Sequence, residues 1–209
     1  MAYINNNKIK GLGGIKRAYL NNTLIFQAFK KDEEVISSYD ITSTFNVTST
    51  TSPTKLYFGE IEKYINEMEI DGIKVDVTSA YTFNTLGEHT VEYMLRDKRD
   101  INSYAFKNCN NLTSIVFKEG LQTINFGAFY SCSSLSSITI PSSVIKIEGY
   151  VFYRCTSLKS ITCLATTSPS IDGNAFKGLT DSGTLYIKEG SDYSTWTSKL
   201  TSWTIQYLT

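Results

Sequence analysis

A phrase of 23 residues recurs through the second half of the chain, and it limits the possible folds more than any other feature. Phe106, Phe129 and Phe152 are spaced at this period. Four more columns keep the same spacing: a cysteine column (Cys109, Cys132, Cys155), a leucine column (Leu112, Leu135, Leu158) and two isoleucine columns (Ile115, Ile138, Ile161 and Ile101, Ile124, Ile147). After one inserted residue the pattern returns in weaker form, with Phe176, Leu179 and Leu185 in the phenylalanine, cysteine and first isoleucine columns.

Such a repeat predicts a solenoid. One unit has too few apolar side chains to bury a core alone, whereas stacked units place each column over the next and share an interior. Leu112, Ile115 and Phe117 are expected to point inward, with Ser114 and Val116 pointing outward. Adjacent coils then pair as parallel strands about 4.8 Å apart. We expect this solenoid over residues 98–209, with residues 183–209 as its cap.

The first half predicts two further β modules, so the expected fold class is all-β. Residues 1–31 are expected to form an arm and a hairpin with its turn at Asn21–Asn22, because asparagine tolerates the left-handed backbone of tight turns. An isolated hairpin is barely stable in water, so it should dock on another domain or chain. The residues expected to anchor it are Tyr3, Ile4, Ile15, Tyr19, Leu24 and Phe26.

Residues 32–97 are expected to form a small β-sandwich. Strand candidates are residues 35–47, 55–58, 67–70, 73–77 and 90–95, and the Asp71–Gly72 pair between two of them predicts a hairpin turn.

The repeat phrases, the linking phrase at residues 140–149 and the closing phrase that begins at Cys163 resemble BspA-like leucine-rich repeats. Such repeats occur in surface proteins of gut and oral bacteria and in proteins of their phages. The phrase at residues 81–91 resembles the last strands of immunoglobulin-like modules that precede these repeats. The resemblance over residues 98–209 implies a fold and says almost nothing about a ligand.

Few residues suggest chemistry. The single histidine, His89, lies in an alternating run that favours a strand or turn position over a role as general base or metal ligand. The acidic residues Glu60, Glu62, Glu67, Glu69, Asp71 and Asp76 are more typical of a solvated face than of a paired glycosidase site. The glycines at residues 11–14 follow no strand and open no helix, so they do not predict a nucleotide loop. We expect no enzyme activity, no cofactor and no metal.

The four cysteines have spacings of 23, 23 and 8 residues, which do not suit a zinc site. Three of them share a column and are interpreted as buried apolar groups. Neighbouring coils could bring them within disulfide range, but parallel side-chain directions and a reducing site of synthesis favour free thiols.

Charge and hydropathy restrict the partners. The chain has 20 basic and 20 acidic residues, which predicts neither nucleic-acid binding nor attraction to an anionic membrane. No apolar run is long enough for membrane insertion. The residues after Met1 hold no apolar core of a secretory signal, so a chain that begins there is not expected to be exported by that route.

The outward faces of the repeats are the candidate ligand-binding surfaces. One regular stripe consists of Ser114, Val116, Ser137, Thr139, Ser160, Thr162 and Tyr186, and a second consists of Tyr130 and Tyr153. Either could contact a host-surface glycan or protein, although every solenoid exposes some polar face.

The preferred functional hypothesis is a structural virion protein of a phage that infects gut bacteria. It would be a head fibre, an auxiliary capsid protein or a tail-associated protein. The N-terminal region would bind other virion proteins, and lysis would release the protein. Fibres and capsid decorations are commonly symmetric oligomers, so we expect a homo-oligomer. The alternative is a BspA-like adhesin on the bacterial cell surface, without its signal sequence.

Overall fold

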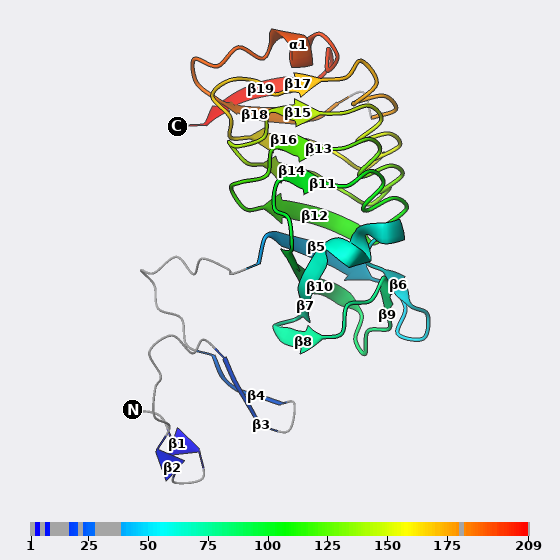
Figure 1. Ribbon diagram of the computed structural model, residues 1–209, viewed down its shortest axis with the longest axis vertical. Coiled ribbons are helices and arrows are strands. Elements are labelled where there is room, and N and C mark those ends of the chain that lie inside the picture. The colour runs from blue at the N-terminus through cyan, green and yellow to red at the C-terminus, as the bar shows by residue number, and fades with distance from the viewer. Residues whose placement is uncertain are drawn as a thin grey trace. The chain divides into compact units, whose positions relative to one another are not determined.

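The computed structural model describes residues 3–4, 7–8, 17–20, 23–27, 39–179 and 182–208 (Figure 1). The chain forms two compact units, Met1–Ser37 and Ser38–Thr209. In the smaller unit, β1 (Tyr3–Ile4) pairs antiparallel with β2 (Asn7–Lys8), and β3 (Arg17–Leu20) pairs antiparallel with β4 (Thr23–Gln27). The residues expected to anchor the hairpin have side chains outside the described part, so their role stays a prediction.

Most of the larger unit is organised around one wide sheet. Its strands in chain order are β5 (Ile41–Val47), β7 (Ile65–Ile70), β8 (Ile73–Val75), β10 (Gly87–Leu95), β12 (Leu112–Phe117), β14 (Ser137–Ile140), β16 (Ser160–Cys163), β18 (Thr184–Lys188) and β19 (Thr204–Leu208). Their spatial order is β19-β18-β16-β14-β12-β5-β10-β7-β8, as Figure 1 shows from top to bottom. The five strands from β12 onward are parallel, and the remaining four pair antiparallel.

A second, four-stranded parallel sheet runs beside the first and completes the coils. It consists of β11 (Asp100–Ile101), β13 (Thr123–Ile124), β15 (Lys146–Ile147) and β17 (Ser170–Ile171). The repeat columns therefore occupy one shared interior, as the period predicts, and the solenoid in the second half of the chain is confirmed.

The front of the solenoid is closed by a strand from the first half of the chain. Strand β5 pairs antiparallel with β12, in a register that opposes Ser43 to Ile115. One sheet and one apolar core thus run through residue 97, and Ser38–Thr209 is a single compact unit. The expected division between residues 97 and 98 marks a change from antiparallel to parallel pairing and does not separate two cores.

One expected strand is wrong. Residues 55–58 were expected to be extended, but β6 (Thr54–Lys55) is short and pairs only with β9 (Ala80–Tyr81). Leu56 and Tyr57 are both buried, which breaks the alternation of a strand that has one solvent face. The chain then turns through Gly59 at φ 67° into the 3-10 helix η1 (Gly59–Tyr64).

The phenylalanine column forms a continuous stack through the core. Phe106, Phe129, Phe152 and Phe176 lie at successive centroid distances of 5.5, 5.8 and 5.8 Å, with ring planes within 8° of parallel. An edge-on aromatic ring closes each end: Tyr93 of β10 lies 5.9 Å from Phe106, and Trp196 of helix α1 (Ser194–Thr197) lies 5.3 Å from Phe176. No helix in the described part of the chain is long and apolar enough to cross a membrane.

Candidate ligand-binding surfaces

The first predicted stripe forms a ladder across the outer face of the wide sheet. The strand register joins Ser114 to Ser137, Ser160 and Thr184, and it joins Val116 to Thr139, Thr162 and Tyr186. Antiparallel pairing carries the same two rows onto Thr44 and Thr42 of β5. The members are half-buried apart from Val116, which is 48% exposed. The structure therefore aligns these residues as the sequence indicated.

The second predicted stripe belongs to a larger aromatic surface on the turns that precede the parallel strands. Tyr130 and Tyr153 lie 4.8 Å apart. Three rings that the sequence analysis missed join them into a closed circuit through contacts of 5.5–6.3 Å: Tyr104, Phe126 and Tyr150. We call these five residues the turn face. A column that alternates Tyr104, Gly127 and Tyr150 was the signal available in the sequence.

Four cations lie against the turn face and the neighbouring Phe58. The Lys107 ammonium is 4.9 Å from the Tyr104 centroid, 5.5 Å from Tyr130 and 5.4 Å from Phe58. Arg154 and Lys177 lie over Tyr153 and Tyr150 at 5.3 and 5.9 Å, and Lys55 lies 4.2 Å from Phe58. Among the described residues, none of the four forms an ion pair with a carboxylate. The turn face therefore combines one exposed ring, Phe126, and four half-buried tyrosines with a positive rim.

Two of the five rings are held by an unfavourable backbone. Tyr104 and Tyr150 have φ values of 60° and 57°, in the left-handed region that bulky residues rarely adopt. The equivalent residue of the coil between them is Gly127, at φ 61°. The turn thus accepts glycine, which adopts this conformation without a steric penalty.

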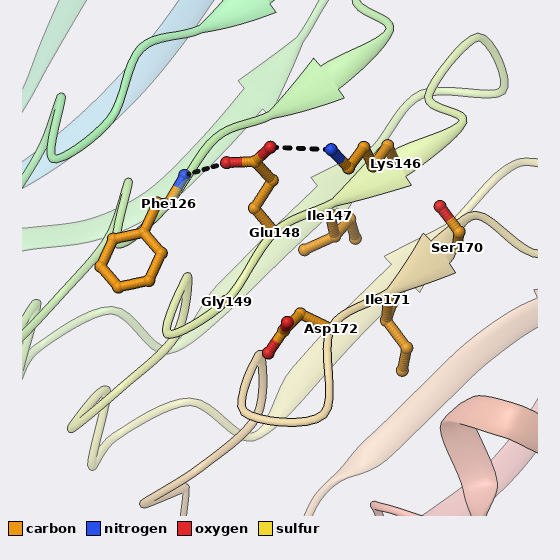
Figure 2. A pocket seen from close by; sticks show the side chains of 8 residues that line it. All are labelled: Phe126, Lys146, Ile147, Glu148, Gly149, Ser170, Ile171 and Asp172. Carbon is orange, nitrogen blue, oxygen red and sulfur yellow. Dashed lines mark hydrogen bonds and ion pairs between the residues drawn. The ribbon is translucent and has the colours of Figure 1, made fainter.

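A pocket of about 390 Å³ opens beside the turn face, over the second sheet (Figure 2). Phe126 forms one wall, Lys146 and Glu148 come from the coil of β15, and Ser170 and Asp172 come from the coil of β17. The Glu148 carboxylate accepts a hydrogen bond from the Phe126 backbone N–H at 3.1 Å and pairs with Lys146 at 2.8 Å. The sequence analysis did not predict this pocket, because its residues follow no single column.

The environment of His89 is that of a structural side chain. It lies in β10 and is 8% exposed, and its Nδ1 is 2.6 Å from Asp71 Oδ2. The other oxygen of Asp71 accepts the Thr90 N–H at 2.9 Å, and His89 Nε2 is 3.0 Å from the Thr85 carbonyl. The histidine therefore links the hairpin turn at Asp71 to a neighbouring loop.

The cysteines are free and buried. The Cys132 thiol donates to the Phe106 carbonyl at 2.9 Å, and the Cys155 thiol donates to the Phe129 carbonyl at 3.1 Å, so each bonds to the preceding coil. Burial raises the pKa of Cys132 to about 12 and that of Cys155 well above its usual value. Within the described residues, no group of three His, Cys, Asp or Glu side chains could hold a metal ion.

Residues 78–194 match the family of BspA type leucine rich repeat regions, in 6 copies. The chain belongs to this BspA-type repeat family. The match begins before residue 98 and therefore includes β10, which the sequence analysis placed in the preceding module. Such repeats fit a surface adhesin-type protein. The match shows neither a phage origin nor an immunoglobulin-like module, and both stay predictions. No curated protein and no solved structure matches the chain.

Proposed function

We propose that this BspA-type repeat protein is a non-enzymatic adhesive display protein that binds a host-surface glycan or protein through its turn face. The observation that carries the proposal is the circuit of five solvent-accessible aromatic rings. Aromatic side chains bury a large area at a small cost in conformational entropy, which is why they dominate binding hot spots. The ladder of the wide sheet consists mostly of small hydroxyl side chains, and Tyr186 is the single aromatic residue in its two described rows.

The backbone of the turn face supports a role in binding. A residue with a side chain in the left-handed conformation costs about 1–2 kcal/mol relative to the right-handed one. Tyr104 and Tyr150 both carry this cost, although glycine serves at the equivalent position of the middle coil. Backbone strain of this kind is often found at functional sites.

Variants that keep the backbone and remove the rings test the proposal. Asparagine tolerates the left-handed region, so Tyr104→Asn and Tyr150→Asn should leave the thermal unfolding midpoint nearly unchanged. We expect the double variant to lose at least tenfold in affinity for the ligands that the unaltered chain binds on a glycan array and on immobilised host-surface proteins. A matched variant of the ladder, Ser114→Ala with Ser137→Ala and Ser160→Ala, should bind normally.

Two results would overturn the proposal. One is that the ladder variant loses binding while the tyrosine variant keeps it, which would assign recognition to the wide sheet. The other is the absence of binding by the unaltered chain to every glycan and protein tested.

The biological setting is a separate part of the proposal. A phage virion component would be anchored by the residues 1–37 unit to other virion proteins as a homo-oligomer, and a bacterial adhesin would be displayed on the cell surface. Quantitative mass spectrometry of purified phage particles distinguishes the two, because a structural virion protein is present at a fixed copy number per particle. Its detection only in bacterial surface fractions would exclude the virion setting.

A further inference from the structure

We infer that the pocket beside Phe126 is a subsite for one neutral pyranose ring of a glycan. This inference rests on the proposed adhesive function and specifies one of its ligands. The pocket volume of about 390 Å³ lies within the range of about 300–1,000 Å³ that is typical of small-ligand sites. Three successive coils supply its walls, so a rigid stack of coils holds the site (Figure 2).

The floor of the pocket is a glycine that brings an aromatic ring and a carboxylate to one point. A Cβ on Gly149 would lie 3.3 Å from Phe126 Cε2 and 3.1 Å from Asp172 Oδ1. Gly149 has no positive φ, so the backbone conformation does not require glycine there. A side chain there would press on both groups, so the glycine lets the ring and the carboxylate lie close together, and a ligand in the pocket can contact both.

The polar groups of the pocket differ in whether they are already paired. Both oxygens of Glu148 are engaged, by Lys146 and by the Phe126 N–H. Asp172 Oδ1 accepts the Asn174 N–H at 2.9 Å, and within the described residues Asp172 Oδ2 accepts no hydrogen bond. Asp172 therefore offers a fixed, charged acceptor, and hydrogen bonds to such groups are about twice as strong as those between neutral groups.

A pyranose has the chemistry that this arrangement recognises. Its axial C–H groups form an apolar face that can lie on the Phe126 ring, which is 38% exposed. Its equatorial hydroxyls point outward and can donate to Asp172 while the Ser170 hydroxyl lies on the same rim. The lining has two carboxylates, Glu148 and Asp172, and one cation, Lys146. Its net charge is negative, so it would repel an acidic sugar and favour a neutral one.

The pocket is continuous with the turn face. The Phe126 centroid lies 5.6 Å from that of Tyr104 and 5.5 Å from that of Tyr150. A sugar bound on Phe126 would thus leave the rest of its chain beside further aromatic rings. The subsite would bind one sugar ring at the edge of the turn face, and the proposed function thereby gains a specific ligand group.

Saturation-transfer NMR on the full chain tests the inference, with the methyl β-pyranosides of glucose, galactose and N-acetylglucosamine and the methyl α-pyranoside of mannose as probes. We expect at least one of them to receive saturation at its C–H protons. Phe126→Ala should weaken that binding about tenfold, and Asp172→Asn should weaken it severalfold. Both side chains are on the surface, so the unfolding midpoint should change little.

Phe58→Ala is the matched control, because Phe58 is also 38% exposed and lies outside the pocket. It should leave monosaccharide binding unchanged. Binding that survives both Phe126→Ala and Asp172→Asn would overturn the subsite. So would the failure of all four probes to bind while the turn face still binds a larger ligand, and in that case the proposed function stands. If the full chain adheres to nothing, the proposed function itself fails.

Discussion

The ring of Tyr104 lies across Gly127 of the following coil, so that a Cβ at residue 127 would be 2.6 Å from Tyr104 Cε1. The same relation recurs one coil later, where the ring of Phe126 lies against Gly149. Tyr104 and Phe126 can therefore lie close to the solenoid because the next coil carries a glycine beneath each ring. The arrangement of these rings therefore depends on the glycines as well as on the aromatic residues.

Replacing Gly127 should destabilise the fold. An alanine there would occupy the left-handed region, at a cost of about 1–2 kcal/mol, and its Cβ would also displace the Tyr104 ring. We expect Gly127→Ala to lower the free energy of unfolding in urea by at least about 1 kcal/mol. Gly173→Ala is the control, because Gly173 has no positive φ and no atom within 4 Å of its Cβ position. Equal effects of the two variants would contradict the argument.

The phenylalanine column and the turn face should respond oppositely to truncation. Phe129 is fully buried between Phe106 and Phe152. Phe129→Ala leaves a cavity in the stack and should cost about 3–5 kcal/mol. Phe126, three residues earlier, is 38% exposed, so Phe126→Ala should change stability by about 0.5 kcal/mol or less. Urea denaturation of both variants measures the difference, and similar losses would show that the turn face is part of the core.

The solenoid could be predicted from the sequence because its core depends on one period. The two isoleucine columns are aligned in space by the strand register, and the phenylalanine column is aligned by its stacked rings. The partner of β12 could not be predicted. Strand β5 is about 70 residues earlier in the chain and lies outside the 23-residue repeat. Its sequence therefore does not show that it covers the open edge of β12.

The turn face was found only in part for a related reason. Tyr130 and Tyr153 share a column, so the sequence shows them as a stripe. Tyr104, Phe126 and Tyr150 come from two adjacent columns, and the other members of these columns are Ser103, Gly127 and Gly149. Only the three-dimensional overlap of one coil with the next brings these rings together, and the pocket beside Phe126 combines three coils in the same way.

The buried thiols should make the fold sensitive to alkali. The pKa of Cys132 is raised from 9.0 to about 12 by burial, so between these values the thiol ionises only in the unfolded chain. The stabilisation is complete below pH 9 and decreases as the pH rises toward 12. Urea unfolding between pH 8 and pH 10.5 should show this decline, and Cys132→Ala should make it shallower. Rapid reaction of the native protein with Ellman's reagent at pH 8 would show that the thiols are accessible after all.

The cap at the end of the solenoid should act locally. Trp196 is fully buried, lies edge-on against Phe176, and donates from Nε1 to the Pro169 carbonyl at 2.9 Å. Trp196→Phe keeps an aromatic ring but removes this bond, which should cost about 1–3 kcal/mol. Because each coil of a solenoid contacts only its neighbours, hydrogen exchange should accelerate in β18 and β19 well before it does in β12. Thr195→Ala, on the exposed side of the same helix, should leave exchange unchanged. Uniform acceleration across all the strands would mean that the larger unit opens as one cooperative body, with the cap stabilising every coil alike.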